Sequence, residues 1–276
     1  MTRRSDLDYI NVVFIITPDD DRRVAFAIDG RKYARSEDVR RDINDALTEL
    51  QKRHINAEFV ESPIEPDGYT SPLPTWQEYK QSLPPVQQVF DSWKSWEQAR
   101  AALGQRLSQK TLGRLDDAIA FATRCHSDQL RPTGEAYIIH LLEVLEILTT
   151  GLRTTDPDFL AAGLLHDVVE DTPCGLDAIR EQFGSQVADW VDSLTQHKGK
   201  RDEYFEHFQS ASLNVLAIKL ADRLSNVQKL DQHPRKEKQK SYYKETVEKI
   251  IPLSHRIPWF EMQFELWRKR FEYLAG

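Results

Sequence analysis

The sequence predicts a mainly α protein, in which an all-helical bundle follows a small α+β domain with the element order β-β-α-β. Three observations predict this fold class. The first sixty residues contain short runs that are rich in β-branched side chains. Prolines then recur between positions 63 and 85 and interrupt any regular pattern. From about Val86 onward, apolar residues return at helical spacing almost to the end of the chain.

The small α+β domain is expected to span residues 1–62. Residues 11–17 and 23–28 have strand composition, and three consecutive aspartates between them predict a hairpin turn. Ser36, followed by two acidic residues, is typical of a helix start. Residues 55–60 are expected to form the closing strand. No known family accounts for residues 1–100, which are candidates for binding a protein partner.

The rest of the chain is expected to divide into three further parts. Residues 63–105 form a proline-rich linker and a connecting helix, residues 106–255 the main helical domain, and residues 256–276 a C-terminal helix. Apolar stripes predict helices that include residues 112–122, 138–148, 159–169, 176–183, 187–194, 213–230, 242–251 and 259–274.

Composition limits the class of protein. A chain of 276 residues with 40% hydrophobic and 29% charged residues can bury a large core and is typical of a globular protein. Its net charge of −7 argues against binding duplex nucleic acid, which normally requires a basic face. We find no segment long enough to span a bilayer. A small anionic substrate, bound by a few local cations, remains compatible with this charge.

The two cysteines, Cys125 and Cys174, do not belong to a Cys-x-x-Cys pair. Their number and spacing favour two reduced thiols that pack as small side chains. The expected location is therefore cytoplasmic.

Residues 161–172 are the most informative segment because they place ionisable side chains on an otherwise apolar helix. His166 and Asp167 are adjacent, and Glu170 and Asp171 follow one turn later. Since positions four apart share a helix face, Glu170 is expected beyond His166 and Asp171 beyond Asp167. Charged groups among buried residues are costly unless they are paired or bound to a metal. The segment therefore predicts a metal site of the hydrolytic kind.

Two further segments supply ligand types. His140 begins the second apolar stripe. Asp222 lies within a helical run in which Lys219 and Asn226 share its face, at spacings of three and four residues. A polar stripe on a leucine-rich helix needs partners, and an ion with a phosphate would supply them.

Two imidazoles and two carboxylates make a mixed nitrogen and oxygen ligand set. Around tetrahedral zinc, these four ligands would close a structural site. Around octahedral Mn²⁺ or Fe²⁺, two positions stay open for water and a substrate oxygen. The open site suits Glu170 and Asp171, which would position the attacking water and remove its proton. Taken singly, His140 has a simpler explanation as a core histidine and Asp222 as half of a surface pair; together they favour the metal site.

Four segments carry a resemblance to a known family: residues 126–140, 162–172, 183–195 and 218–226. They resemble the hydrolase domain of the RelA/SpoT homologues, within the HD phosphohydrolase superfamily. The likeness covers about residues 106–255. The His-Asp-x-x-Glu-Asp pattern that begins at His166 is especially similar to the alarmone hydrolases of this family.

The resemblance implies an all-helical HD-domain bundle that hydrolyses the 3′-pyrophosphate of (p)ppGpp to GDP or GTP plus pyrophosphate. It implies a manganese ion, with Fe²⁺ as an alternative, held by His140, His166, Asp167 and Asp222. It implies that water is activated by Glu170 and Asp171. It implies substrate contacts from Arg131, Tyr137, Lys219 and Asn226. With no synthetase-like segment after the domain, the chain is expected to be similar to small stand-alone hydrolases.

Four positions depart from the family pattern: Pro132, Ala136, Leu141 and Ser225. They leave the substrate open between (p)ppGpp, an adenosine alarmone such as ppApp, another 3′-phosphorylated nucleotide and a pyrophosphorylated RNA end. A hydrolase acting on one of the alternatives would suit an antitoxin to a toxic synthetase. A nucleotide-binding regulator without turnover is a third hypothesis, disfavoured because all six predicted metal and catalytic residues are present.

Overall fold

The structure, a computed structural model, describes residues 10–17, 20–29, 48, 57–58, 86–196 and 201–275. The chain divides into two compact units, Met1–Val86 and Gln87–Gly276. Each unit is described by itself.

In the first unit the described residues include three strands: β1 (Ile10–Thr17), β2 (Asp20–Asp29) and β3 (Ala57–Glu58). They form an antiparallel sheet in the order β2-β1-β3. The β1–β2 register runs evenly from Ile10 opposite Asp29 and shifts after Ile15. The strands overlap the three predicted ones. The helix predicted to start near Ser36 lies outside the described residues, so the complete β-β-α-β arrangement stays a prediction.

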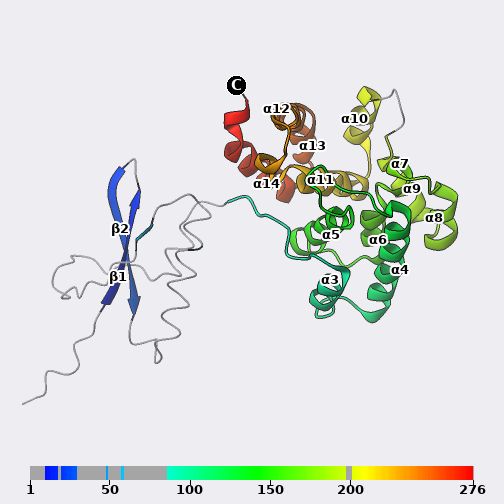
Figure 1. The fold of residues 1–276 in the computed structure, drawn as a ribbon, viewed down its shortest axis with the longest axis horizontal. Helices are drawn as coiled ribbons and strands as arrows, with labels where there is room; N and C mark the ends of the chain where they lie inside the picture. The colour runs from blue at the N-terminus through cyan, green and yellow to red at the C-terminus, as the bar shows by residue number, and fades with distance from the viewer. Residues whose placement is uncertain are drawn as a thin grey trace, which may run out of the picture. The chain divides into compact units, whose positions relative to one another are not determined.

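The second unit is helical, as the sequence predicts (Figure 1). Its α-helices are α3 (Trp96–Leu103), α4 (Gln109–His126), α5 (Ile138–Glu146), α6 (Pro157–Leu165), α7 (Val168–Asp171), α8 (Leu176–Phe183), α9 (Ser185–Leu194), α10 (Arg201–Ser210), α11 (Leu213–Val227), α12 (Lys236–Glu245), α13 (Ile251–Ser254) and α14 (Pro258–Arg270). Single π-turns, η2 (Ile147–Gly151) and η4 (Thr246–Ile250), extend α5 and α12. Short 3₁₀ turns are η3 (Leu230–Gln232) and η5 (Glu272–Leu274).

Helix α6 lies at the centre of this unit and packs against α4, α5, α9 and α11 (Figure 1). Every residue from Phe159 to Leu165 is buried, as expected for a helix that is apolar all round. Asp156 caps its start by accepting hydrogen bonds from the next helical N–H groups. Gly163 permits a close approach, because a Cβ there would lie 2.6 Å from Leu148 Cδ1. The central helix thus holds its C-terminal residues at a fixed place in the core.

The structure corrects the predicted helix over residues 159–169. It ends at Leu165, and a separate short helix, α7, begins at Val168. Asp167, with ψ −4°, interrupts the regular helical backbone between them. Glu170 and Asp171 therefore do not continue the face of α6. Helix α10 was not predicted, because Tyr204, Phe205 and Phe208 are too few to mark an apolar stripe among its polar residues.

The expectation of two free thiols is wrong. Cys125, near the end of α4, and Cys174, which follows α7, form a disulfide with a Cα–Cα distance of 6.0 Å. Their separation of 49 residues carries no local motif, and the packing of α4 against α7 brings them together. The prediction of a cytoplasmic location rested on two reduced cysteines, and the disulfide removes that support.

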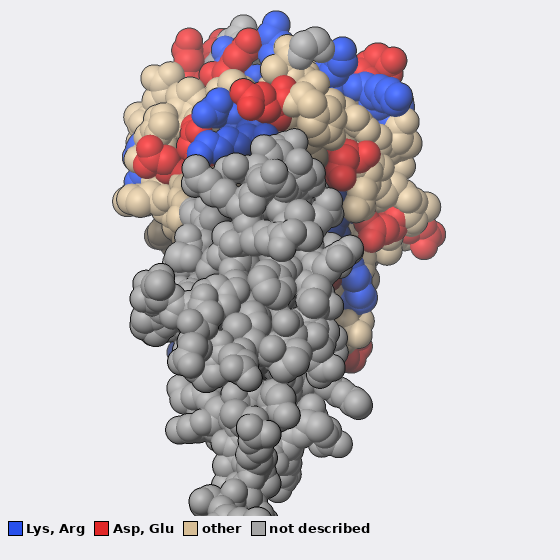
Figure 2. Space-filling view, turned by 90° about the vertical axis from the view of Figure 1, so that its left-hand side faces the viewer, with Lys and Arg blue, Asp and Glu red and all other residues tan. Residues whose placement is uncertain are grey.

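Among the described residues, no helix combines the length and the apolar character needed to cross a membrane. In the view of Figure 2, Lys and Arg side chains are interspersed with Asp and Glu side chains on the described surface. The chain contains 37 Lys and Arg and 44 Asp and Glu residues, so a surface that carries both signs of charge is expected.

Candidate metal centre and active site

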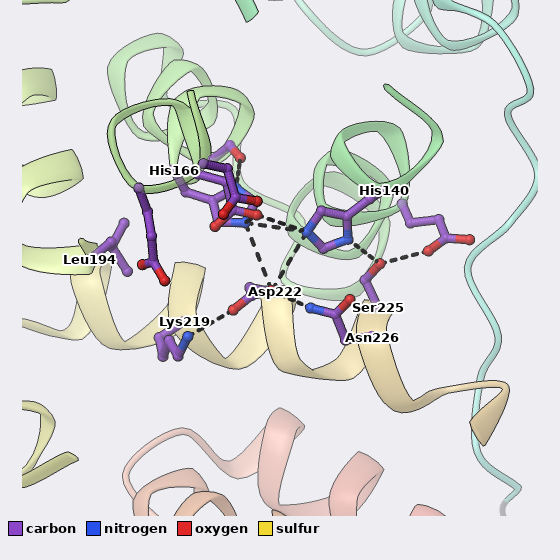
Figure 3. A network of polar contacts seen from close by, with 12 residues as sticks. His140, His166, Leu194, Lys219, Asp222, Ser225 and Asn226 are labelled. Atoms are coloured by element: carbon purple, nitrogen blue, oxygen red, sulfur yellow. Dashed lines mark hydrogen bonds and ion pairs between the residues drawn. The ribbon is translucent and has the colours of Figure 1, made fainter. Parts of the chain in front are cut away.

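Four predicted ligands from separate parts of the sequence meet in the second unit (Figure 3). His140 lies in the first turn of α5, and Asp222 lies in the middle of α11. His166 and Asp167 occupy the junction between α6 and α7. One ligand atom from each residue lies within 4.8 Å of all the others. The structure therefore brings together the complete set of residues that the sequence singled out as metal ligands.

The spacing of these atoms suits one divalent ion. His166 Nε2 lies 3.0 Å from Asp167 Oδ2 and 3.8 Å from Asp222 Oδ1. His140 Nε2 lies 3.4 Å and 3.5 Å from the same two oxygens. Ligand atoms about 2.1 Å from an ion, at angles of about 90–110°, are separated by roughly 3.0–3.5 Å. The four atoms thus enclose a space of the size that an ion such as Mn²⁺ or Fe²⁺ needs.

The orientation of the two imidazoles also fits a cation. Their Nε2 atoms face each other at 3.3 Å. His166 Nδ1 lies 2.8 Å from the carbonyl oxygen of Gly163, which can only accept, so Nδ1 carries the proton. His140 Nδ1 contacts Ser225 Oγ at 2.8 Å. Two Nε2 lone pairs that point into one space repel each other unless a cation or a proton lies between them, so the site is built for positive charge.

Charge compensation in the cluster is reflected in its pKa values. Burial alone would lower the pKa of His166, but the carboxylates of Asp167 and Asp222 outweigh it and raise that pKa to about 10. Burial would raise the pKa of Asp222, but Lys219 and His166 outweigh it and lower that pKa well below the usual range. Without an ion, the site therefore holds a proton on His166 against two ionised carboxylates.

Lys219 and Asn226 approach Asp222 from the neighbouring turns of α11 (Figure 3). Lys219 Nζ donates to Asp222 Oδ2 at 2.8 Å, and Asn226 Nδ2 donates to Asp222 Oδ1 at 2.6 Å. Although burial opposes the charge on Lys219, Asp222 outweighs it and raises the lysine pKa. The predicted polar stripe thus finds partners within itself, and both residues orient a candidate ligand.

Glu170 and Asp171 lie on α7, with exposed side chains at the edge of the cluster. Glu170 Oε2 accepts a hydrogen bond from the backbone N–H of Gln196 at 2.8 Å. Partial burial of its carboxyl group, with Asp167 nearby, raises the pKa of Glu170. Asp171 Oδ2 accepts from Gln129 Nε2 at 3.2 Å. The raised pKa makes Glu170 a candidate general base beside the candidate metal centre.

The two remaining predicted residues differ in how they reach the cluster. Tyr137 donates a short hydrogen bond to Asp167 Oδ2, and its ring stacks on His126 at 4.4 Å. The Arg131 side chain is only 13% exposed, and its Nη1 donates to Glu143 Oε2 at 2.8 Å. Arg131 is therefore engaged by a buried carboxylate beside the candidate metal centre.

Sequence reasoning did not assign a role to Glu143, to Ser225 or to His126. Glu143 is an acid among leucines, three residues after His140, and that spacing would have marked it. Ser225 was noted only as a departure from a family pattern. His126 is 6% exposed, and its Nε2 atom has no hydrogen-bond partner among the described residues. Each of these three lies within contact of a predicted site residue.

The helical fold and its cluster of two histidines and two carboxylates place the chain among helical proteins with a candidate metal centre. The chain belongs to the HD-domain family, because residues 118–259 match the profile described as the HD domain. That range covers half of the chain and includes all four candidate ligands.

Similar curated proteins carry alarmone-related names. The chain is 38% identical over 166 residues to a guanosine-3′,5′-bis(diphosphate) 3′-pyrophosphohydrolase of Aquifex aeolicus, covering 57% of this chain and 23% of the relative. It is 37% identical over 172 residues to a GTP pyrophosphokinase of Streptomyces coelicolor, covering 58% and 20%. It is 33% identical over 179 residues to the bifunctional (p)ppGpp synthase/hydrolase SpoT of Escherichia coli, covering 61% and 25%. The chain therefore spans a quarter or less of the length of these relatives.

One solved structure extends the comparison to the fold. A metazoan ortholog of SpoT, described as hydrolysing ppGpp, superposes with a TM-score of 0.52 at 27% identity. The match covers 57% of this chain and 95% of that protein. More than half of this chain therefore shares its fold with nearly the whole of that solved structure.

Proposed function

We propose that this chain hydrolyses the 3′-pyrophosphate of (p)ppGpp, giving GDP or GTP and pyrophosphate. The observation that carries the proposal is the meeting of His140, His166, Asp167 and Asp222 beside the acids of α7. Names of relatives support the substrate class, since the Aquifex aeolicus protein is named for this reaction and the metazoan SpoT ortholog is described as hydrolysing ppGpp.

The four ligands are proposed to hold Mn²⁺, with Fe²⁺ as an alternative that the same ligand set accepts. Four protein ligands around an octahedral ion leave room for two more oxygen atoms. When bound, such an ion supplies positive charge that polarises phosphoryl oxygens and makes water more acidic. Facing imidazole nitrogens and two ionised carboxylates support an ion of charge +2 at this position.

Glu170 and Asp171 are proposed as the catalytic acids. The oxygen of an attacking water forms a bond to the phosphorus next to the ribose O3′, and the bond from that phosphorus to O3′ breaks. Glu170 takes the proton from water, a role that its raised pKa supports. Asp171, held by Gln129, positions the water, and the departing O3′ receives the proton that Glu170 removed from the water.

Lys219, Asn226, Tyr137 and Arg131 are proposed to contact the nucleotide. The Lys219 ammonium group has three N–H donors, and its interactions with Asp222 and Tyr204 leave at least one of them, while Asn226 has one amide donor left. These donors are available to phosphate and ribose oxygens. The ring of Tyr137 is the proposed contact for the nucleoside, while Arg131, held by Glu143, offers its remaining N–H groups to the base.

The direct test is an assay of purified protein with Mn²⁺, in which ppGpp and ppApp are supplied separately and products are separated by ion-exchange chromatography. Pyrophosphate and GDP from ppGpp are the expected products. Turnover of ppApp alone would move the substrate to an adenosine alarmone. Absence of turnover with either compound would contradict the proposal.

A substitution at Glu170 tests the proposed base. Glu170→Ala should lower kcat by about 10²–10⁴-fold, the usual contribution of general-base catalysis, and leave bound metal unchanged. Glu181→Ala is the matched control, since Glu181 is an exposed acid on the neighbouring helix α8. Full activity of Glu170→Ala would show that another group removes the proton.

A further inference from the structure

We propose that Ser225 and Glu143 are positioning residues that hold His140 in the tautomer and orientation required for binding the ion. This inference rests on the proposed metal-dependent function, and it concerns the ion rather than the nucleotide. It assigns roles to two buried polar residues that the proposed reaction leaves without one.

The geometry is a chain of hydrogen bonds that ends at His140 (Figure 3). His140 Nδ1 and Ser225 Oγ are 2.8 Å apart, and Ser225 Oγ lies 2.6 Å from Glu143 Oε2. His140, Ser225 and Glu143 are 1%, 2% and 3% exposed, so water does not compete for these bonds. Buried polar groups that satisfy each other in this way hold one arrangement of side chains.

The direction of each bond follows from the chemistry of the groups. A carboxylate oxygen accepts, so the single hydroxyl proton of Ser225 goes to Glu143. Ser225 Oγ has no second proton, and therefore it accepts from His140. The proton of His140 is thus on Nδ1, and the lone pair of Nε2 points towards His166 and the two carboxylates. That tautomer is the one that can ligate the ion through Nε2.

Arg131 binds Glu143 at the end of this series of hydrogen bonds that lies away from His140. Its Nη1 donates to the same oxygen of Glu143 that accepts from Ser225, at 2.8 Å. The ion pair compensates the buried charge of Glu143, so the carboxylate can remain an acceptor inside the protein.

The series of hydrogen bonds also joins two helices that carry candidate metal ligands. Glu143 and His140 lie one turn apart on α5, whereas Ser225 lies one turn beyond Asp222 on α11. Helices α5 and α11 pack against each other. The hydrogen bonds between them therefore set the position of His140 relative to Asp222, in addition to selecting its tautomer.

The test is a measurement of Mn²⁺ affinity in the absence of nucleotide, by competition between the metal-depleted protein and a fluorescent chelator. Ser225→Ala should weaken binding by about 10–100-fold, the usual effect of removing a group that orients a metal ligand. Ser254→Ala is the matched control: Ser254 is also fully buried, and its hydroxyl donates to Ile251 O away from the cluster. This control should keep the affinity of the unaltered protein.

Two substitutions of similar size at Glu143 separate positioning from general stability. Glu143→Gln keeps an oxygen that accepts from Ser225, so affinity should stay within about threefold. Glu143→Leu removes the acceptor and lets the serine proton turn towards His140, which favours the tautomer with a proton on Nε2. Binding should weaken by at least as much as in Ser225→Ala. Thermal unfolding of each variant establishes that the protein remains folded.

A double-mutant cycle completes the test. Since the three groups act as one chain, Ser225→Ala combined with Glu143→Leu should weaken binding no more than the stronger single change. Unchanged affinity in Ser225→Ala, or effects of the two changes that multiply, would overturn the inference. Because no nucleotide is present, these outcomes are independent of the proposed reaction: a protein with the expected affinities that leaves ppGpp intact contradicts only the proposed function.

Discussion

The two imidazoles of the candidate metal centre are held in opposite ways. His166 donates from Nδ1 to the carbonyl oxygen of Gly163, three residues earlier on the same helix. His140 donates to a side chain of α11, 85 residues away, which in turn depends on Glu143 and Arg131. One ligand is oriented by its local backbone, and the other by contacts between two helices.

This difference shows where the site is robust to mutation and where it is sensitive. No side-chain substitution removes the carbonyl that orients His166, because every residue at position 163 supplies one. The orientation of His140 depends on three side chains, each of which can be lost by one substitution. The following substitutions and conditions affect His140, His166 or both, and the largest expected effect comes first.

Asp222 lies beside the imidazoles of both His140 and His166, so its loss should affect the surroundings of both at once. Asp222→Asn removes a charged ligand and leaves buried Lys219 without its partner, which costs roughly 3–5 kcal/mol of folding free energy. Metal retained after dialysis, measured by mass spectrometry of the element, should fall to background. Asp231→Asn, at a surface aspartate on η3, should retain metal. Equal retention in both variants would remove Asp222 from the ligand set.

The disulfide between Cys125 and Cys174 closes a loop that contains both candidate ligand histidines but neither Ser225 nor Asp222. Opening a loop of this length should lower the free energy of unfolding by about 2–4 kcal/mol. At roughly 2–4 °C per kcal/mol for a protein of this size, Tm should fall by about 4–16 °C. The measurement is thermal unfolding with and without dithiothreitol.

The double variant Cys125→Ser/Cys174→Ser is the control for this experiment, and its Tm should not respond to the reductant. If reduction leaves the Tm of the unaltered protein unchanged, the disulfide does not stabilise the helical unit.

A substitution at Gly163 tests whether the local backbone hydrogen bond is enough to orient His166. Gly163→Ala places a methyl group 2.6 Å from Leu148 Cδ1, so we expect a loss of about 1–3 kcal/mol from overpacking. The carbonyl that orients His166 remains, so Mn²⁺ affinity of the folded protein should stay within about threefold. Gly113→Ala, on α4 with open space around its Cβ, should not lower Tm. A large loss of affinity in Gly163→Ala would mean that helix packing, and not the local hydrogen bond, positions His166.

The pH dependence of metal binding follows from His166, whose pKa is raised to about 10 from 6.5. In the metal-free protein its proton contributes stability that is complete below pH 6.5 and is lost as pH rises through about 10. Because the ion must displace this proton, Mn²⁺ affinity should increase by about tenfold per pH unit within that window. Chelator competition between pH 6.5 and 8.5 measures the slope. A slope of zero would mean that His166 binds the ion without releasing a proton.

Much of the fold could be predicted from local patterns. The apolar stripes located most helices of the second unit, because helical periodicity is a property of neighbouring residues. The same patterns missed α10, which has few apolar side chains, and joined α6 to α7 across the break at Asp167. Periodicity does not report a change in backbone direction when the residues on both sides remain apolar.

The candidate ligands could also be identified from residue types and from resemblance, and the structure brings all four together. The partner of Arg131 could not. The sequence suggested a nucleotide for both Lys219 and Arg131, whereas the structure gives Lys219 a bond to Asp222, three residues along the same helix, and Arg131 a bond to Glu143. The Lys219 bond is compatible with helical spacing. The acceptor that Arg131 reaches depends on how its loop packs against α5, and a linear pattern does not contain that information.

The sequence by itself determined the helical class and the identity of the four candidate ligands, because both are expressed by residues within a few turns of one another or by side-chain chemistry alone. Only the tertiary structure decided the disulfide, the break before α7 and the hydrogen bonds that orient His140. The disulfide and the hydrogen bonds join segments that are dozens of residues apart, and the break changes the direction of the backbone between two neighbouring helices. Such contacts are selected by the packing of the whole helical unit, in which small differences in helix position decide which polar groups meet.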